Sequence, residues 1–407
     1  QPDLIGMTAT TPFFHRIIAM AKELKRASSV PIIVGGQHVS IVGQEAMEEC
    51  LDYLMLGECE RIFKDFLNQF EKGERAIDLP GIMFRREGEI QFSGPAAALT
   101  NLDDSPAPAR HLLRNDLYFI GTLRGRKRYT SVQMSRGCAF RCVYCASDLY
   151  GRKIRRHSME RVVQELEEIV NVQKIRHIYF IDDTLTVDRK FIFSLCDEIE
   201  KRNLRFTFEG GTRANLWDEE VASRLKACGL IRISFGLETA VPEILKLIKK
   251  DVPLEAYVTA NRINNRLGIE TINSVMLGLP GDTRETIRQT VDFLCKARDI
   301  HHTTYGIAMP YPGTELRAMA ERGENGLKLI EKDFSKLQRY GSAVMEVNGL
   351  TPEDLVELQK EGLRRIYSCW WRIIPMIRRH GILSLIPPIW ETIKDRFKKF
   401  GNRGDPA

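Results

Sequence analysis

The sequence predicts an α/β protein with a partial doubly wound (Rossmann-like) parallel sheet, followed by a (β/α)6 partial TIM barrel and a helical C-terminal region. Two alternations of apolar strands with amphipathic helices carry this prediction. The first fills about the first eighty residues, and the second, longer one begins near residue 130. Strands that alternate with helices form parallel sheets covered by helices. The length of 407 residues also indicates two or three domains.

The first domain is expected over residues 1–76. Residues 3–9, 30–36 and 52–58 have the apolar pattern of buried strands, and residues 13–26, 44–51 and 61–73 have helical patterns. Three strands make only half of a doubly wound sheet, and the chain begins at Gln1 almost within a strand. We therefore expect an N-terminal portion of this domain to be missing.

Residues 77–125 are expected to form a hairpin and a linker. The segment GIMFRREGEIQFSG (81–94) predicts a β-hairpin that turns at Glu87 and Gly88. The segment NLDDSPAPAR (101–110) is polar and rich in proline, which is typical of a linker. The domain boundary is predicted here.

The barrel is expected over residues 126–313. Strands are predicted at 131–135, 176–182, 205–211, 231–238, 271–280 and 303–310, and helices at 159–170, 189–202, 218–229, 243–250, 256–268 and 284–300. Gly229 is placed to stop its helix, and Asp282 with Glu285 predicts a capping box. In such a barrel the chemistry is expected at the carboxyl ends of the strands.

Residues 314–407 have a helical pattern only. Their tail (368–390) mixes tryptophan, proline and arginine, so it could cap the barrel or lie on a membrane surface. We favour the cap and keep peripheral membrane contact as the alternative.

Bulk composition excludes several classes. The formal charge is +6 with both signs interspersed, so nucleic acid is not expected as a partner; the basic residues 124–129 and the last forty residues are local exceptions that we read as solvated faces. No window of about 18 apolar residues and no signal peptide is present. Six of the nine cysteines stand singly in apolar patterns, which indicates core use and a reducing, cytoplasmic compartment.

The other three cysteines, Cys138, Cys142 and Cys145, directly follow the first barrel strand. Thiolates at this spacing can converge on one inorganic centre, and a cubic iron–sulfur cluster takes one ligand per iron. Three cysteines then leave one iron free to bind a ligand through an amine and a carboxylate.

Two alternatives to the cluster remain. A structural zinc site would need a fourth ligand, and the nearest later histidine, His157, begins a helical pattern. A chance cluster in a core conflicts with the polar residues Arg136, Gly137 and Arg141 in the same loop. The sequence therefore favours a [4Fe-4S] cluster.

The pattern Cys-x3-Cys-x2-Cys with Tyr144 before the last cysteine, on the first loop of a six-unit barrel, resembles the radical S-adenosylmethionine (SAM) superfamily. The resemblance implies that the free iron binds SAM and that reductive cleavage yields a 5′-deoxyadenosyl radical. It also implies an electron donor such as flavodoxin or ferredoxin. Tyr144 is assigned to cofactor binding on the same ground.

Further segments match the superfamily. FIDDT (180–184) resembles the segment after the second strand, and Asp182 and Asp183 would hold the ammonium of SAM; the alternative is helix capping, as for Asp188. SFGLETA (234–240) resembles the fourth-strand segment, whose glutamate, here Glu238, contacts the cofactor. A buried pair of Glu238 with Arg213 is the alternative, and Arg213 is included among the cofactor residues.

Two later segments complete the match. MLGLPGDT (276–283) resembles the fifth-strand segment, in which Gly278 and Gly281 would let backbone approach the adenosine, or would form a plain turn. PYPGTEL (310–316) has its counterpart after the sixth strand.

The whole set, preceded by a doubly wound domain, resembles the radical SAM enzymes that carry an N-terminal cobalamin-binding domain, such as the anaerobic magnesium-protoporphyrin monomethyl ester cyclase and certain carbon methyltransferases. In VGGQH (34–38), Gly35 and Gly36 would contact cobalamin, and Gly57 would do so or form a turn. None of the eight histidines has the Asp-x-His-x-x-Gly context that ligates cobalt. The cobalamin assignment therefore rests on the resemblance of the domain and not on a cobalt-ligating histidine.

The resemblance predicts methylation, cyclisation or rearrangement of an unactivated carbon. A methylthiolating enzyme of RNA or protein is one alternative, and a non-enzymatic iron–sulfur or zinc module is another. The substrate is expected to be a small molecule, which would be hydrophobic if Trp370, Trp371 and Trp390 form a lid. Its candidate contacts, each of which could equally be a rim or packing residue, are Arg152, Lys153, Arg155, Tyr305 and Tyr311.

Overall fold

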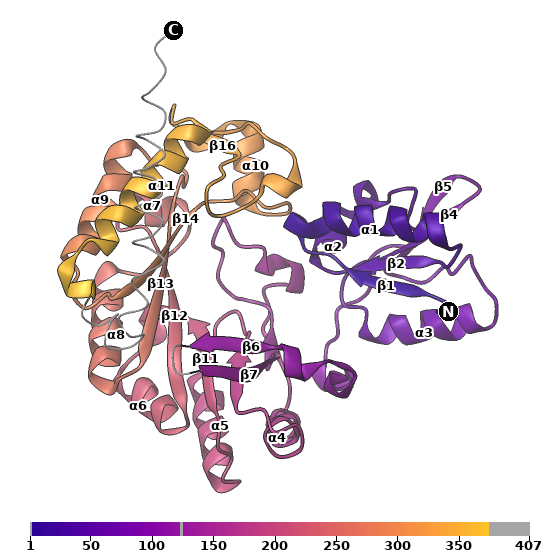
Figure 1. Ribbon diagram of the computed structural model, residues 1–407, viewed down its shortest axis with the longest axis horizontal. Helices are drawn as coiled ribbons and strands as arrows, with labels where there is room; N and C mark the ends of the chain where they lie inside the picture. The colour runs from indigo at the N-terminus through magenta and orange to yellow at the C-terminus, as the bar shows by residue number, and fades with distance from the viewer. Residues whose placement is uncertain (1, 123–124, 374–407) are drawn as a thin grey trace.

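The computed structural model describes residues 2–122 and 125–373, which form an N-terminal sheet domain and a larger open barrel (Figure 1). The N-terminal sheet has the order β1-β2-β3-β4-β5, with β1 to β3 parallel and β4 and β5 antiparallel. Its strands are β1 (Ile5–Thr8), β2 (Ile32–Gly35), β3 (Tyr53–Met55), β4 (Ile82–Arg86) and β5 (Glu89–Phe92).

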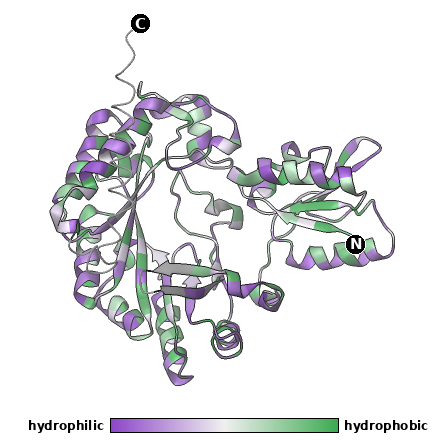
Figure 2. Cartoon of the chain, in the orientation of Figure 1, coloured by the Kyte–Doolittle hydropathy of each residue, from purple (hydrophilic) through white to green (hydrophobic). Residues whose placement is uncertain are grey.

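Helices cover both faces of this sheet. Helix α1 (Phe14–Ala27) packs on the face that holds Ile32 and Val34, and α3 (Glu60–Glu71) packs on the face that holds Ile33. Successive side chains of a strand point to opposite faces, so the continuous apolar run of β2 serves two cores. Figure 2 shows the strands as mostly hydrophobic and the covering helices as two-sided. This is the predicted doubly wound arrangement.

Two predictions for this domain need correction. The hairpin assigned to the connecting residues 77–125 turns at Glu87 and Gly88 as predicted, but β4 continues the sheet, because its buried residues 82–84 join the same cores. The second helix, α2 (Gln37–Val42), starts seven residues before the predicted 44–51 and is followed by a short 3₁₀ turn (Gly43–Ala46). It begins directly after Gly36.

The barrel sheet contains six parallel strands, as predicted, in the order β14-β13-β12-β11-β10-β7, and the antiparallel strand β6 forms its other edge. These strands are β6 (Phe119–Thr122), β7 (Gly125–Val132), β10 (His177–Phe180), β11 (Thr207–Thr212), β12 (Leu230–Glu238), β13 (Glu270–Leu277) and β14 (His302–Ile307). The first strand ends at Val132, earlier than predicted, and a two-residue ribbon of β8 (Ser135–Arg136) and β9 (Arg155–Arg156) follows.

The barrel helices lie outside this sheet (Figure 1): α4 (Met159–Glu167), α5 (Arg189–Lys201), α6 (Glu219–Ala227), α7 (Pro242–Leu247), α8 (Leu254–Leu267) and α9 (Arg284–Lys296). The side chain of Asp188 caps α5 by accepting from Phe191 N, as the sequence suggested. The predicted capping box of Asp282 and Glu285 is wrong, because Thr283 and Thr286 form the box of α9. Asp282 is buried and accepts a hydrogen bond from Leu279 N instead.

The C-terminal region is helical as predicted, with α10 (Glu315–Arg322) and α11 (Pro352–Tyr367). It also holds a two-stranded ribbon that the sequence did not predict, β15 (Leu327–Leu329) with β16 (Met345–Val347). Helix α11 packs on α9 and β14. Most of the predicted tail, including Trp390, lies outside the described residues. Within the described part of the chain, no helix is long and apolar enough to cross a membrane.

Candidate functional site

The three clustered cysteines lie beyond the carboxyl end of β7, on the segment that follows β8. All three are free thiols, with Cys145 exposed and the other two half-buried. The loop enters through Gly137, whose φ is +92°, and a Cβ there would lie 2.5 Å from Lys153 O. Only glycine tolerates both conditions. Burial raises the pKa of the Cys138 thiol.

Backbone hydrogen bonds hold this cysteine loop (residues 137–145) against the barrel. Val143 N donates to Ile248 O at 3.2 Å, and Leu316 N donates to Val143 O at 2.8 Å. Between the second and third cysteines, the hydroxyl of Tyr144 donates to Glu238 Oε1 at 2.8 Å. The loop is therefore fixed to three residues that each lie more than 90 positions further along the chain.

Glu238 ends β12 in a strained conformation, with φ +65°, and is buried. Its carboxylate also contacts Lys250 Nζ at 3.3 Å, and that lysine is buried as well. The alternative pairing of Glu238 with Arg213 is thus wrong, because Lys250 takes that place. Sequence reasoning missed Lys250, since a lysine after a helix is usually solvated.

Arg213 lies at the end of β11 and faces the cysteine loop. Its Nη1 is 3.7 Å from Cys142 Sγ, and its guanidinium carbon lies 3.8 Å from the ring centroid of Phe140. The side chain is buried, and its Nε has no hydrogen-bond partner among the described residues. A buried cation with an unused donor fits an anionic group bound beside Cys142.

The two neighbouring aspartates have different surroundings. Asp182 accepts from Ser135 Oγ and Met134 N, so it ties the strand-end segment after β7 to β10. Asp183 accepts from Ser147 Oγ at 3.0 Å, and that hydroxyl lies 3.0 Å from Cys145 Sγ. Burial raises the pKa of both carboxyl groups. Of the pair, Asp183 is the one that is linked to the cysteine loop, through Ser147 to Cys145.

The fifth-strand segment forms a tight turn after β13. Gly278 has φ +79° and Gly281 has φ +84°, so both need the left-handed backbone. A Cβ on Gly281 would lie 2.8 Å from a methyl of Leu247, and one on Gly278 would lie 3.4 Å from Leu355. A tight turn by itself explains why glycine stands at both positions. The contact of Gly278 and Gly281 with the adenosine of SAM remains a prediction.

The strand ends of the N-terminal domain carry little side-chain bulk. Thr8 and Gly57 are exposed, while Gly35 and Gly36 are half-buried. Gly36 has φ +102°, and a Cβ there would lie 2.6 Å from Thr8 Oγ1. Such a surface lets a bulky planar group approach the backbone closely, so these residues fit a cobalamin.

A buried ion-pair network joins this domain to the cysteine loop. Glu58, which follows β3, contacts Arg136 Nη1 at 3.1 Å and accepts from Arg155 Nη1 at 2.9 Å. Burial would raise the pKa of Glu58, but Arg155 and Arg136 outweigh it and hold the pKa below its ordinary value. Sequence reasoning singled out the adjacent Gly57 and missed Glu58.

The substrate contacts suggested by the sequence mostly have structural partners. Arg155 belongs to the network with Glu58, and Arg152 donates to Phe140 O at 2.6 Å. Tyr305 is buried in the barrel core beneath α11, while Tyr311 is half-buried. The packing interpretation therefore holds for Arg155 and Tyr305.

The donor set suits a cluster better than a single zinc ion. Among the described residues, no three cysteine, histidine or carboxylate side chains surround one point closely enough to hold one metal ion. Tetrahedral zinc would bring its sulfurs to within about 4 Å of one another, whereas a cubic cluster spreads its ligands over separate irons. The thiols and the adjacent Arg213 thus fit a [4Fe-4S] cluster.

Comparison with known proteins agrees with this geometry. The radical SAM superfamily matches residues 132–294, and the B12-binding domain matches residues 1–67. An uncharacterized methyltransferase from Pyrococcus horikoshii is 30% identical over 375 residues, which cover 91% of this chain and 79% of the relative. The anaerobic magnesium-protoporphyrin IX monomethyl ester cyclase of Rubrivivax gelatinosus is 25% identical over 379 residues, covering 90% of this chain and 66% of the cyclase.

The fold has a solved counterpart. The radical SAM methyltransferase TsrM from Kitasatospora setae, with cobalamin and a [4Fe-4S] cluster bound, superposes with a TM-score of 0.70 at 20% identity and covers 91% of this chain and 79% of TsrM. The protein is thus an enzyme whose cofactors are a [4Fe-4S] cluster, SAM and cobalamin, and whose reaction is a methylation or a cyclisation. The chain belongs to the radical SAM superfamily, among the enzymes with an N-terminal B12-binding domain.

Proposed function

We propose that this enzyme methylates an unactivated carbon of a small, hydrophobic molecule. The observation that carries the proposal is the buried network of Glu58 with Arg136 and Arg155, which holds the strand ends of the B12-binding domain beside the cysteine loop. When bound, the three cofactors together supply an electron, a methyl group and a radical that removes hydrogen from carbon. Methyl transfer needs the cobalamin and SAM sites side by side, and this network supports that placement.

The proposed roles of the residues follow from their positions. Cys138, Cys142 and Cys145 would be the cluster ligands, and Arg213 would balance the negative charge beside Cys142. Tyr144 and Glu238 would keep the loop in register with β12.

Further cofactor contacts are proposed for six more residues. Asp182 and Asp183 would lie on the amino-acid side of SAM and Gly278 and Gly281 on its adenosine side, while Gly35 and Gly36 would lie under cobalamin.

Methylation is preferred to cyclisation because several relatives are named as methyltransferases. They include the Pyrococcus protein, the cytidylyl-2-hydroxyethylphosphonate methyltransferase of Streptomyces wedmorensis and the hopanoid C-3 methylase of Methylococcus capsulatus. The last of these is 27% identical over 307 residues, covering 74% of this chain and 57% of the methylase, and supports a hydrophobic substrate. The comparisons do not favour methylthiolation or a non-enzymatic module.

We also propose a flavodoxin or ferredoxin as the electron donor and a cytoplasmic location, since the cysteines of the described residues are free thiols. The proposed domains are residues 1–76 extended by the hairpin to Phe92, then a linker to 125, a barrel of residues 126–313 and a C-terminal region of 314–407. Contact of the tail with a membrane surface rests on the sequence alone.

The test is anaerobic reconstitution with iron, sulfide and cobalamin, then reduction with SAM labelled in its methyl group. We expect 5′-deoxyadenosine and S-adenosylhomocysteine to form together, and both to be lost in Cys142→Ala. Formation of 5′-deoxyadenosine without S-adenosylhomocysteine would show cyclisation or rearrangement in place of methylation. If neither product forms in protein that carries four irons, the proposal is wrong.

A further inference from the structure

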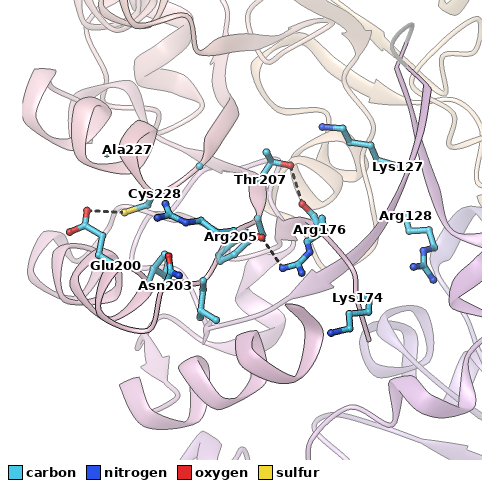
Figure 3. Close-up of a pocket in the computed structure, with 14 residues that line it drawn as sticks. Lys127, Arg128, Lys174, Arg176, Glu200, Asn203, Arg205, Thr207, Ala227 and Cys228 are labelled. Carbon is cyan, nitrogen blue, oxygen red and sulfur yellow. Dashed lines mark hydrogen bonds between the residues drawn. The ribbon is translucent and has the colours of Figure 1, made fainter. Parts of the chain in front are cut away.

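A groove of about 630 Å³ is drawn in Figure 3. It opens at the end of the barrel where the strands begin, opposite the end that carries the cysteine loop. Its lining residues stand where strands begin: Arg176 directly precedes β10, Thr207 begins β11, and Gly229 directly precedes β12. On β7, the lining residue Lys127 lies five residue steps, or about 17 Å, from Val132 at the strand's other end. The groove is therefore separate from the cofactor site.

Positive charge dominates this groove. Five cationic side chains line it, all of them exposed, and none forms an ion pair within the described part of the chain: Lys127, Arg128, Lys174, Arg176 and Arg205. The one acidic residue in the lining, Glu200, is engaged by Arg224 Nη1 at 2.7 Å. Cations that gather without carboxylate partners repel one another, and a bound anion would relieve that repulsion.

The charges surround an apolar floor. Ile199, Leu204, Phe206 and Cys228 line the groove from below and are each buried to more than nine-tenths. Figure 3 shows Arg176 and Arg205 next to each other at the middle of the groove, where Arg176 Nη1 donates to Arg205 O at 3.1 Å. This bond holds one guanidinium in place over the groove, which reduces the entropy that a ligand must overcome.

We propose that this groove binds a soluble organic phosphate. An apolar or aromatic group of the ligand lies on the floor, and a phosphate or diphosphate lies among the five cations. Guanidinium groups pair with phosphate oxygens in a two-pronged geometry, and a volume of 300–1,000 Å³ is the ordinary range for sites that hold molecules of nucleotide size. A nucleoside diphosphate has both the aromatic part and the charge that the groove accommodates.

An electron-donor protein is a weaker occupant. An acidic redox protein would match the charge, but it would stand at the far end of the barrel from the cysteines, with the whole length of β7 between them. The size and the apolar floor of the groove also suit a small molecule better than a flat protein surface.

The test is an anaerobic calorimetric titration of the reconstituted protein with uridine diphosphate, in the presence of saturating SAM, with uridine and inorganic pyrophosphate as partial probes. We expect uridine diphosphate to bind more tightly than pyrophosphate, uridine not to bind, and the affinity to fall as salt rises. In parallel, lysine acetylation read by mass spectrometry should show Lys127 and Lys174 protected by uridine diphosphate and Lys64 unprotected. Absence of binding at millimolar ligand, or binding without this protection, would overturn the proposal.

A charge-matched pair of variants sharpens the result. Lys174→Glu with Arg176→Glu should weaken uridine diphosphate binding by at least about tenfold, because two charged hydrogen-bond donors are lost. Arg61→Glu with Lys64→Glu changes the net charge equally on the exposed face of α3 and should leave binding unchanged. If both double variants weaken uridine diphosphate binding equally, the effect comes from the net charge of the protein at long range. That result would contradict a binding site in the groove. If the protein binds phosphatidylglycerol vesicles but not uridine diphosphate, the groove contacts a lipid surface. That result would also contradict the proposed organic-phosphate site.

Discussion

Arg136, two residues before the first cysteine of the cysteine loop, pairs with Glu58 at the end of β3, with 3.1 Å between Nη1 and Oε2. The side chains are 14% and 5% exposed, so both charges are largely removed from water. Arg155 completes the network from the other side. One carboxylate thus joins the B12-binding domain to the cysteine loop. Removing it takes the carboxylate partner from Arg155 and leaves Arg136 with Glu60 alone.

We therefore predict that Glu58→Gln lowers stability by about 3–5 kcal/mol, the usual cost of breaking a buried ion pair. Cobalamin affinity should fall with it, because the domain loses its fixed position beside the loop. The thermal unfolding midpoint and a cobalamin titration measure the two effects. Glu23→Gln, in an exposed pair with Arg26, serves as the control and should change the midpoint little. If Glu58→Gln and Glu23→Gln change the unfolding midpoint equally, the buried network does not stabilise the protein as predicted.

Arg213→Gln should lower the reduction potential of the cluster. Arg213 is buried with Nη1 3.7 Å from Cys142 Sγ, and a cation beside an anionic centre favours the more negative, reduced form. An electron-paramagnetic-resonance redox titration measures the potential, and iron content should stay the same. Arg213→Lys keeps the charge and should restore most of the shift. An unchanged potential in Arg213→Gln would place the arginine in a packing role.

Tyr144→Phe and Lys250→Met test the anchoring of the loop through Glu238. Loss of the tyrosine hydroxyl removes one hydrogen bond to a carboxylate, at a cost of about 1.5–3 kcal/mol. Loss of the ammonium group leaves Glu238 buried without its cation, which should cost more, about 3–5 kcal/mol. Thermal unfolding gives the order of the two effects. The reverse order would mean that Lys250 does not pair with Glu238 in solution.

Asp282 predicts a pH dependence of stability. Burial raises its pKa from 3.8 to about 6, so the folded state holds this proton more tightly than the unfolded chain. The resulting stabilisation is complete below pH 3.8 and is lost as the pH rises through 6, by about 3 kcal/mol in all. Asp282→Asn should remove this contribution, which unfolding midpoints at pH 5 and pH 7.5 would show. Asp65→Asn, on α3, should keep the wild-type dependence.

Gly36→Ala should destabilise the N-terminal domain more than Gly43→Ala. Both glycines have positive φ, which costs an alanine about 1–2 kcal/mol. At Gly36 the added Cβ would also lie 2.8 Å from Ala9 O, whereas at Gly43 nothing lies within 4 Å. Limited proteolysis of the N-terminal domain measures the difference. Similar cleavage rates for the two variants would show that β1 moves to accept the methyl group.

Much of the site could be predicted because its residues follow one another in the sequence. Cys138, Cys142 and Cys145 lie on one loop, and each of the six strands has a local apolar pattern. The loop and the strands could therefore be predicted without knowledge of any long-range contact. Glu58 and Lys250 could not be found in this way. Each looks like a solvated charge in its own segment. Glu58 meets arginines 78 and 97 positions away, and Lys250 folds back onto Glu238 at the end of the preceding strand.

The capping of α9 shows the same limit at short range. Asp282 and Glu285 have the right spacing for a capping box, yet the box forms at Thr283, because burial draws Asp282 to the backbone of the preceding turn.

The sequence by itself determined the two sheet domains and the cysteine loop, since hydrophobic period and cysteine spacing are local properties of the chain. The tertiary structure alone decided which charges meet. It placed Glu58 between two arginines and Lys250 against Glu238, and it left five cations unpaired around a groove at the far end of the barrel. The reason is physical: the energy of a charge depends on its burial and on its nearest opposite charge, and both are set by how separate segments of the chain pack against one another.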